Sequence, residues 1–228
     1  MKISVIIPVY NEAKTIARII HRVKESNPTL DMEILVVDDC STDGTSGAVG
    51  ALGDSSIVLM RHARNQGKGA AIRTALARVS GDVVIIQDAD LEYDPKDYSK
   101  LLAPIIAKET SVVYGSRILK KDNPRAGFTF YIGGRLLSFL ANALYGLRIT
   151  DEPTCYKVFK SDILRSLDLK CTGFEFCPEV TAKLARKGYS IVEVPISYRP
   201  RSVAEGKKIR WRDGVTAVWT LLKYRFCS

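Results

Sequence analysis

The feature that most constrains the fold is the alternation of unbroken apolar segments with amphipathic ones in the first half of the chain. Five apolar segments rich in β-branched residues, at 3–9, 33–38, 56–61, 82–88 and 111–117, are separated by stretches with helical periodicity. Strands that are apolar along their whole length are buried on both faces, as in a parallel sheet covered by helices. The sequence therefore predicts an α/β fold with a mostly parallel sheet and helices on both faces.

Polar residues stand where these predicted strands end. The first strand is followed by Glu12, the second ends at Asp38 and Asp39, the fourth ends at Asp88, and the fifth is followed by Arg117. In open parallel sheets, ligands bind beyond the carboxyl ends of the strands. We therefore expect these side chains to form one ligand site.

The stretch QDADLEYDP (87–95) places acids at every second position, namely Asp88, Asp90 and Glu92. In an extended segment such residues point to the same side. Carboxylate oxygens suit Mg²⁺ or Mn²⁺, which bind proteins through one or two carboxylates together with substrate phosphates. The sequence predicts a metal site at these three residues. The alternative is a loop in which Asp94 caps a helix and the other acids face water.

Two common nucleotide-binding motifs are absent from the chain. The first strand is followed by PVYNEA without GxGxxG, and RNQGKGAA (64–71) lacks GxxxxGK[ST]. Lys68, between two glycines at a predicted helix start, still suits an anion bound by backbone N–H groups and the helix dipole. A tight turn would equally explain the glycines. His21 and His62 have no partner at a catalytic spacing, and we interpret both as structural.

The net charge of +9 is concentrated at the C-terminal end. Residues 199–228 contain eight Lys or Arg against two acids, a net +6. This favours an anionic partner, which could be phosphate groups, a membrane surface or nucleic acid, although a solvated basic face is the alternative. The acids at the strand ends would repel a nucleic acid, so we expect no nucleic-acid partner.

The cysteines and the apolar runs indicate the cellular location of the protein. Five cysteines without a CxxC pattern favour a reducing cytosol over a disulfide framework. The N-terminal MKISVIIPVYNE is typical of a first strand and not of a signal peptide. No uncharged apolar run approaches the roughly 18 residues that a membrane-spanning helix needs. We expect a cytoplasmic protein that associates peripherally with the cytoplasmic face of a membrane.

The second half of the chain departs from the strand–helix alternation. An aromatic and apolar helix is predicted at 130–147, a second helix at 178–188, a strand at 190–199, and a final amphipathic helix carrying Trp211 and Trp219. Tryptophan combined with Lys and Arg is typical of interfacial helices, whereas packing on the sheet is the alternative. Four cations on separate segments suit phosphate groups: Arg117, Arg135, Arg201 and Lys207.

Eight segments in chain order carry a resemblance to family 2 glycosyltransferases, and specifically to the dolichyl-phosphate mannose synthase group. They are PVYNE (8–12), VVDDCSTDGT (36–45), RNQGKGAA (64–71), QDADLEYDP (87–95), GSR (115–117), R-x-x-S-x-x-x-N (135–142), TDEPTCYKVF (150–159) and EVPISYRPR…EGKK (193–208).

The resemblance implies a glycosyltransferase A fold and inverting, metal-dependent transfer of a sugar to a polyprenyl or dolichyl phosphate. The implied donor is GDP-mannose; a UDP-sugar donor (glucose or N-acetylhexosamine) and a saccharide hydroxyl acceptor are the alternatives. We expect residues 1–117 to bind the donor, 118–208 the acceptor, and 209–228 to form the basic C-terminal helix. An ionised phosphate acceptor needs no general base, whereas a hydroxyl does, and Asp151 lies where relatives could place one.

The resemblance also implies roles for individual residues. EGKK leaves the choice between Lys207 and Lys208 open, and some members carry Gln where Glu92 stands. The expected catalytic residues are Asp88, Asp90, Arg117 and Arg201, and the expected Mg²⁺ or Mn²⁺ ligands are Asp88, Asp90 and Glu92. The expected nucleotide-sugar site comprises Pro8, Tyr10, Glu12, Val37, Asp39, Lys68, Asp88, Ala89, Asp90, Arg201 and Lys207, and the acceptor site comprises Arg117, Arg135, Ser138 and Asn142.

Overall fold

A computed structural model describes residues 1–124, 127–201, 206 and 208–227. Its described residues form a seven-stranded sheet in the order β3-β2-β1-β4-β6-β5-β7, in which only β6 runs against the other strands. The mostly parallel sheet is therefore confirmed. The strands are β1 (Ile3–Val9), β2 (Met32–Asp38), β3 (Ile57–Arg61), β4 (Val83–Ile86), β5 (Val112–Ser116), β6 (Lys157–Lys160) and β7 (Val192–Pro195).

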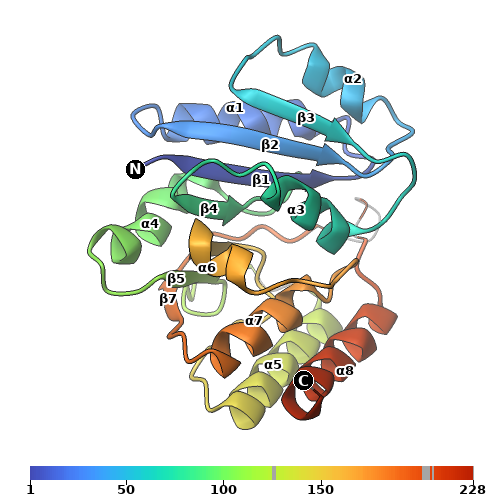
Figure 1. Ribbon diagram of the computed structural model, residues 1–228. Helices are drawn as coiled ribbons and strands as arrows, with labels where there is room; N and C mark the ends of the chain where they lie inside the picture. Colours follow the sequence, from blue (N-terminus) through green and yellow to red (C-terminus); the bar gives the residue numbers. More distant parts are fainter. Residues whose placement is uncertain (125–126, 202–205, 207, 228) are drawn as a thin grey trace.

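Helices cover both faces of this sheet, and three more helices pack together at one end of it (Figure 1). Figure 1 shows α3 in front of the strands and α1 behind them, while α5, α7 and α8 lie side by side below. The helices are α1 (Ile16–Ser26), α2 (Thr45–Gly50), α3 (Lys68–Leu76), η1 (Pro95–Asp97), α4 (Tyr98–Ile106), α5 (Phe128–Tyr145), α6 (Ser161–Ser166), α7 (Phe176–Arg186) and α8 (Trp211–Phe226).

The antiparallel strand β6 brings residues of the second half of the chain to the carboxyl edge of the parallel strands. Because β4 and β5 are both antiparallel to β6, they run in the same direction, and their carboxyl ends lie at the same edge. The chain enters β6 from that edge, so residues 150–156 reach it as well. Residues from both halves of the sequence are thus brought to one place.

The core agrees with the sequence pattern in the central strands, whereas the predicted burial on both faces is wrong for β3, which lies at the edge of the sheet and exposes Val58 and Leu59. Strands β1 and β4 are buried along their whole length, as their β-branched runs predict. A second, smaller apolar cluster joins α5, α7 and α8 through Leu137, Ala141, Ala182, Ala217 and Leu221. Among the described residues, no helix has both the length and the hydropathy that a membrane span requires.

Candidate active site

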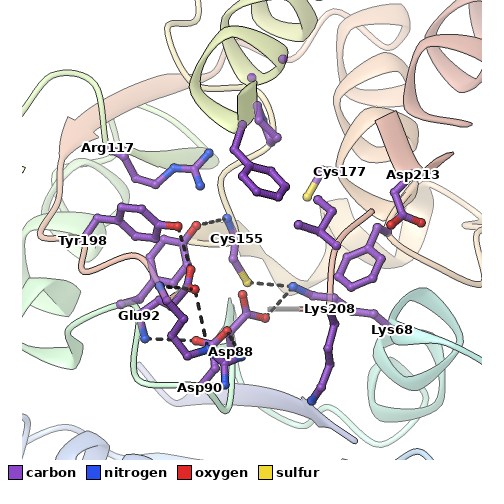
Figure 2. Close-up of a pocket in the computed structure, with 18 of the residues that line it drawn as sticks. Lys68, Asp88, Asp90, Glu92, Arg117, Cys155, Cys177, Tyr198, Lys208 and Asp213 are labelled. Atoms are coloured by element: carbon purple, nitrogen blue, oxygen red, sulfur yellow. Dashed lines mark hydrogen bonds and ion pairs between the residues drawn. The ribbon is translucent and has the colours of Figure 1, made fainter. Parts of the chain in front are cut away.

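A cavity of about 1540 Å³ lies at the carboxyl edge of the sheet and draws its walls from both halves of the chain (Figure 2). Lys208 lines it too, whereas Lys207 lies outside the described residues. The predicted site residues among its walls are Pro8, Tyr10, Glu12, Asp39, Lys68, Asp88, Ala89, Asp90, Glu92, Arg117, Arg135 and Arg201.

Asp88 is paired with the lysine that begins α3. Lys68 Nζ lies 2.5 Å from Asp88 Oδ1 and 3.2 Å from the Cys155 Sγ atom. Burial alone would lower the pKa of Lys68, but the charge and hydrogen bond of Asp88, together with the neighbouring Cys155 and Cys177, raise that pKa well above its ordinary value. Lys68 therefore stays charged.

The glycines beside Lys68 serve packing. A Cβ on Gly67, whose φ is +94°, would lie 2.4 Å from the Thr172 carbonyl oxygen. The N–H groups of Gly69 and Ala70 donate to the carbonyl oxygens of Gly173 (3.1 Å) and Thr172 (3.0 Å). These two N–H groups are thus not free to bind an anion, which contradicts the prediction of an anion bound by backbone N–H groups at this turn. The Lys68 side chain remains the candidate anion contact at this helix start, and that role stays a prediction.

Asp90 is paired with an arginine that lies 111 residues away in the chain. Arg201 Nη2 donates to Asp90 Oδ2 at 2.9 Å, and Arg201 Nη1 donates to Glu12 Oε1 at 3.1 Å. Lys208 Nζ also donates to Glu12 Oε1, at 2.7 Å. Burial, and then the charges of Asp88 and Glu92, raise the pKa of Asp90 to about 7. The acids of this region thus carry more negative charge than Arg201 offsets at Asp90.

Both carboxylate oxygens of Glu92 have protein partners. Its Oε2 accepts from Tyr198 Oη at 2.7 Å, and its Oε1 accepts from the Arg201 backbone N–H at 2.9 Å. Within the part of the chain that the structure describes, no three His, Cys, Asp or Glu side chains form a group that could hold a metal ion. The assignment of Asp88, Asp90 and Glu92 as metal ligands stays a prediction. Asp88 and Asp90 are a donor set that would fit an ion bound by two carboxylates and substrate phosphates.

Asp39 holds the loop that carries Lys68. Its Oδ1 lies 2.7 Å from His62 Nδ1 and accepts from the Gln66 N–H at 2.8 Å, while its Oδ2 accepts from the Gly67 N–H at 2.7 Å. The interpretation of His62 as structural agrees with this contact. Val37 is fully buried in β2 and is not among the cavity walls, so its side chain does not face the cavity, and its expected place in the nucleotide site stays a prediction.

Arg117 is held on the opposite side of the cavity by Asp151. Its Nε and Nη2 donate to the two Asp151 oxygens at 2.8 and 2.7 Å, and its backbone N–H donates to Oδ2 at 2.8 Å. Burial would raise the pKa of Asp151, but Arg117 overcomes this and lowers it. Because both oxygens of Asp151 are occupied and the pKa is low, Asp151 is poorly suited to act as a general base.

Of the other predicted acceptor residues, Arg135 lines the cavity, and Ser138 and Asn142 lie behind its wall. Arg135 is exposed at the cavity wall, and its Nη1 donates to the Thr150 carbonyl oxygen at 3.2 Å. Ser138 and Asn142 do not line the cavity. Ser138 Oγ accepts from the Glu152 N–H at 2.9 Å, and Asn142 Nδ2 donates to the Ile149 carbonyl oxygen at 2.8 Å. Both tie α5 to the loop that carries Asp151.

Comparisons with known proteins show the family to which this chain belongs. The family model described as Glycosyl transferase family 2 matches residues 4–168. The chain is 31% identical to an undecaprenyl-phosphate mannosyltransferase of Micrococcus luteus, with 99% of each chain covered. It is 29% identical to a UDP-N-acetylglucosamine–dolichyl-phosphate N-acetylglucosaminyltransferase of Methanococcus voltae, covering 91% of this chain and 90% of that one.

The fold has a solved counterpart. Glucosyl-3-phosphoglycerate synthase of Mycobacterium tuberculosis, in complex with Mn²⁺, UDP and phosphoglyceric acid, superposes with a TM-score of 0.75 at 22% identity and covers 100% of this chain and 79% of its own. At that identity the likeness establishes the glycosyltransferase A fold alone. The chain belongs to glycosyl transferase family 2, and it is a glycosyltransferase.

Proposed function

We propose that this protein transfers one sugar, with inversion, from a nucleotide sugar to a polyprenyl phosphate. The observation that carries the proposal is the extent of the cavity. It runs from the acids at the ends of β1 and β4, past Arg117, to apolar residues of α5 and α8 such as Phe130, Leu137 and Trp211. A ligand with an anionic head and an apolar tail fits such walls. The names of the Micrococcus and Methanococcus relatives, which both specify a polyprenyl-type phosphate, support the same acceptor.

The donor that we propose first is GDP-mannose. The Micrococcus relative is named a mannosyltransferase, and it matches this chain from end to end. A UDP-sugar is the alternative, because the Methanococcus relative is named for UDP-N-acetylglucosamine. Tyr10 and Asp39 would face the nucleoside, and Lys68, Arg201 and Lys208 would face its diphosphate.

The reaction needs positioned cations more than it needs a base. An oxygen of the acceptor phosphate forms a bond to the anomeric carbon, while the bond from that carbon to the diphosphate oxygen breaks and its electron pair leaves with the nucleoside diphosphate. No proton has to be removed, because a phosphate monoester is ionised at neutral pH. Arg117 and Arg135 orient the attacking phosphate, and Lys68 with Arg201 stabilises the charge that develops on the leaving group.

Asp88 and Asp90 would hold the Mg²⁺ or Mn²⁺ ion that accompanies the diphosphate. Bound there, a divalent cation supplies electrostatic stabilisation of the departing diphosphate. The clustering of carboxylates supports this assignment, since the charges of Asp88 and Glu92 next to Asp90 favour the arrival of positive charge. Lys68 and Arg201 pair with Asp88 and Asp90, and each side chain is long enough to turn toward the diphosphate.

These assignments give three parts of the chain different roles, in binding the donor, the acceptor and the membrane. Residues 1–117 would bind the donor and 118–208 the acceptor. The helix within 209–228, together with α5, would contact the membrane that holds the lipid. Exposed apolar side chains recur along both helices. They are Phe128, Ile132, Leu136 and Phe139 on α5 and Trp211, Val215, Trp219 and Phe226 on α8.

Replacing both tryptophans of α8, Trp211→Gln with Trp219→Gln, is expected to lower binding to anionic vesicles at least tenfold. These rings are 76% and 63% exposed, and Arg212, Lys223 and Arg225 on the same helix suit anionic headgroups. Sedimentation with phosphatidylglycerol vesicles measures the effect. Ile106→Gln, which changes a 59% exposed residue of α4, serves as the control. Equal binding by all three proteins would contradict the membrane assignment.

Nucleotide sugars are expected to raise the melting temperature of the protein, and to do so more strongly with Mn²⁺ than without it. A ligand that binds only the native state stabilises by mass action, about 2.7 kcal/mol at a hundred times its Kd. A thermal-shift panel of GDP- and UDP-sugars, each with and without Mn²⁺, would name the donor. The donor proposal fails if no nucleotide sugar shifts the transition under either condition.

A further inference from the structure

The segment that carries Arg201 is fastened to the acidic stretch through one residue, Glu92. Its carbonyl oxygen accepts from the Arg199 N–H at 2.9 Å, its Oε1 from the Arg201 N–H at 2.9 Å, and its Oε2 from Tyr198 Oη at 2.7 Å. A β-bridge between Tyr93 and Tyr198 extends the contact. Both carboxylate oxygens of Glu92 are therefore committed to the 198–201 segment.

Tyr198 also reaches the other side of the cavity. The Arg117 guanidinium carbon lies 5.0 Å from the centroid of the Tyr198 ring, in cation–π contact. The ring is buried and packs against Tyr93, with 5.3 Å between ring centroids. Figure 2 shows Tyr198 between Glu92 and Arg117. One side chain thus links the arginine that pairs with Asp90 to the arginine that pairs with Asp151.

We propose that Glu92 and Tyr198 form a positioning pair that fixes Arg201 and Arg117 relative to each other. The assignment of Arg201 to the donor and Arg117 to the acceptor rests on the proposed function, whereas the pairing itself does not. In-line transfer requires the donor diphosphate and the acceptor phosphate to be held at a set separation, and small misplacements cost large factors in rate. A rigid link between the two arginines supplies that separation.

The surroundings of Arg201 explain why an acid stands at position 92. Arg201 Nε is buried, donates no hydrogen bond to any of the described residues, and lies 3.7 Å from Glu92 Oε1. The Glu92 carboxylate therefore serves Arg201 twice, by accepting its backbone N–H and by facing its guanidinium. Glutamine in this position would keep an acceptor for the N–H and a polar group for the Tyr198 hydroxyl, but alanine would keep neither.

Three substitutions test the positioning role. Glu92→Ala is expected to lower kcat/KM about a hundredfold. Tyr198→Phe keeps the ring over Arg117 but loses the hydroxyl, and we expect about a tenfold loss. Glu92→Gln is expected to stay within about threefold of the wild type. The control Tyr145→Phe, which removes a buried hydroxyl bonded to the Leu221 carbonyl oxygen outside the cavity, is expected to keep full activity.

Two measurements need no substrate and so do not depend on the proposed function. Amide hydrogen exchange at Arg201 is expected to accelerate at least tenfold in Glu92→Ala, because its acceptor is lost. Titration with Mn²⁺ alone, followed by electron paramagnetic resonance, is expected to give the same affinity for the wild type and Tyr198→Phe, so the lost activity of this variant is not a loss of metal. The proposal is overturned if the Mn²⁺ affinity of Tyr198→Phe falls tenfold, or if the activity of Tyr198→Phe and the Arg201 exchange rate in Glu92→Ala match the wild type. Should Glu92→Ala fail to fold, Tyr198→Phe and Glu92→Gln decide the question by the same criteria.

Discussion

Asp90→Asn is expected to lower kcat/KM for sugar transfer by about two to three orders of magnitude, with the fold retained. The substitution keeps the shape of the side chain but removes the charge that pairs with Arg201 at 2.9 Å and that would hold the divalent cation. Groups placed where charge develops in the transition state supply the largest single contributions to catalysis, so the loss should fall mainly on kcat. Steady-state kinetics with the wild type as reference measure it.

Two further acids provide matched controls for this variant. Asp94→Asn retains an oxygen for the Lys96 N–H, with which Asp94 caps η1, and Asp31→Asn changes an exposed residue at the opposite end of β2. Both are expected to stay within about twofold of the wild type, as surface substitutions away from special features do. Normal turnover by Asp90→Asn in Mn²⁺-supplemented buffer would rule out the role given to Asp90.

Arg117→Lys is expected to have the second-largest effect, a loss of about a hundredfold in kcat/KM. Lysine retains the charge but cannot make the two-pronged contact with Asp151 or stack on Tyr198. The buried Asp151 would also lose guanidinium hydrogen bonds, although the backbone N–H of residue 117 would still donate to it. We expect the free energy of unfolding to fall, by less than the roughly 3–5 kcal/mol typical when a buried ion pair loses one partner altogether. Kinetics and urea unfolding on the same preparation measure both effects.

The pH dependence distinguishes this role from general-base catalysis. Arg117 lowers the pKa of Asp151 in the folded protein, so the pair stabilises the fold above the unfolded pKa of about 3.9, and that stability is lost as pH falls through the folded pKa. Asp151→Asn is therefore expected to reduce stability at pH 7 and to reduce it less at pH 3. Between pH 6 and 8 the shape of its rate profile should match that of the wild type. A base-catalysed limb that disappears in Asp151→Asn would instead favour a hydroxyl acceptor.

The first half of the fold was predictable because each strand there is apolar along its whole length. The pattern failed at β6, whose sequence KVFK begins with a lysine. Lys157 is fully buried because its ammonium donates to the Glu152 carbonyl oxygen at 2.7 Å and lies 3.4 Å from the centroid of the Tyr114 ring. Such partners come from the tertiary structure, so the hydrophobic periodicity of the sequence does not predict them. The predicted strand at 190–199 also shortens to β7, which lies at the edge of the sheet.

The site was predictable where it depends on strand ends and not where it depends on partners distant in sequence. Polar residues after the first, fourth and fifth strands do gather in one cavity. The pairing of Asp90 with Arg201 joins residues 111 positions apart, and spacing alone could not reveal it. Alternation in QDADLEYDP correctly grouped three acids but could not show that Glu92 turns to Tyr198. Tyr198 carried no signal, because an aromatic residue in a predicted strand is ordinary.

The most direct test of the central claim is to identify the product of the purified protein. The enzyme would be incubated with Mn²⁺, each nucleotide sugar of the thermal-shift panel, and undecaprenyl or dolichyl phosphate in detergent, and the lipid fraction analysed by mass spectrometry. We predict a glycosyl polyprenyl monophosphate carrying a single sugar, formed with one donor and absent with Asp90→Asn. Transfer of sugar to a saccharide hydroxyl, with no glycosylated lipid phosphate from any donor, would contradict the claim.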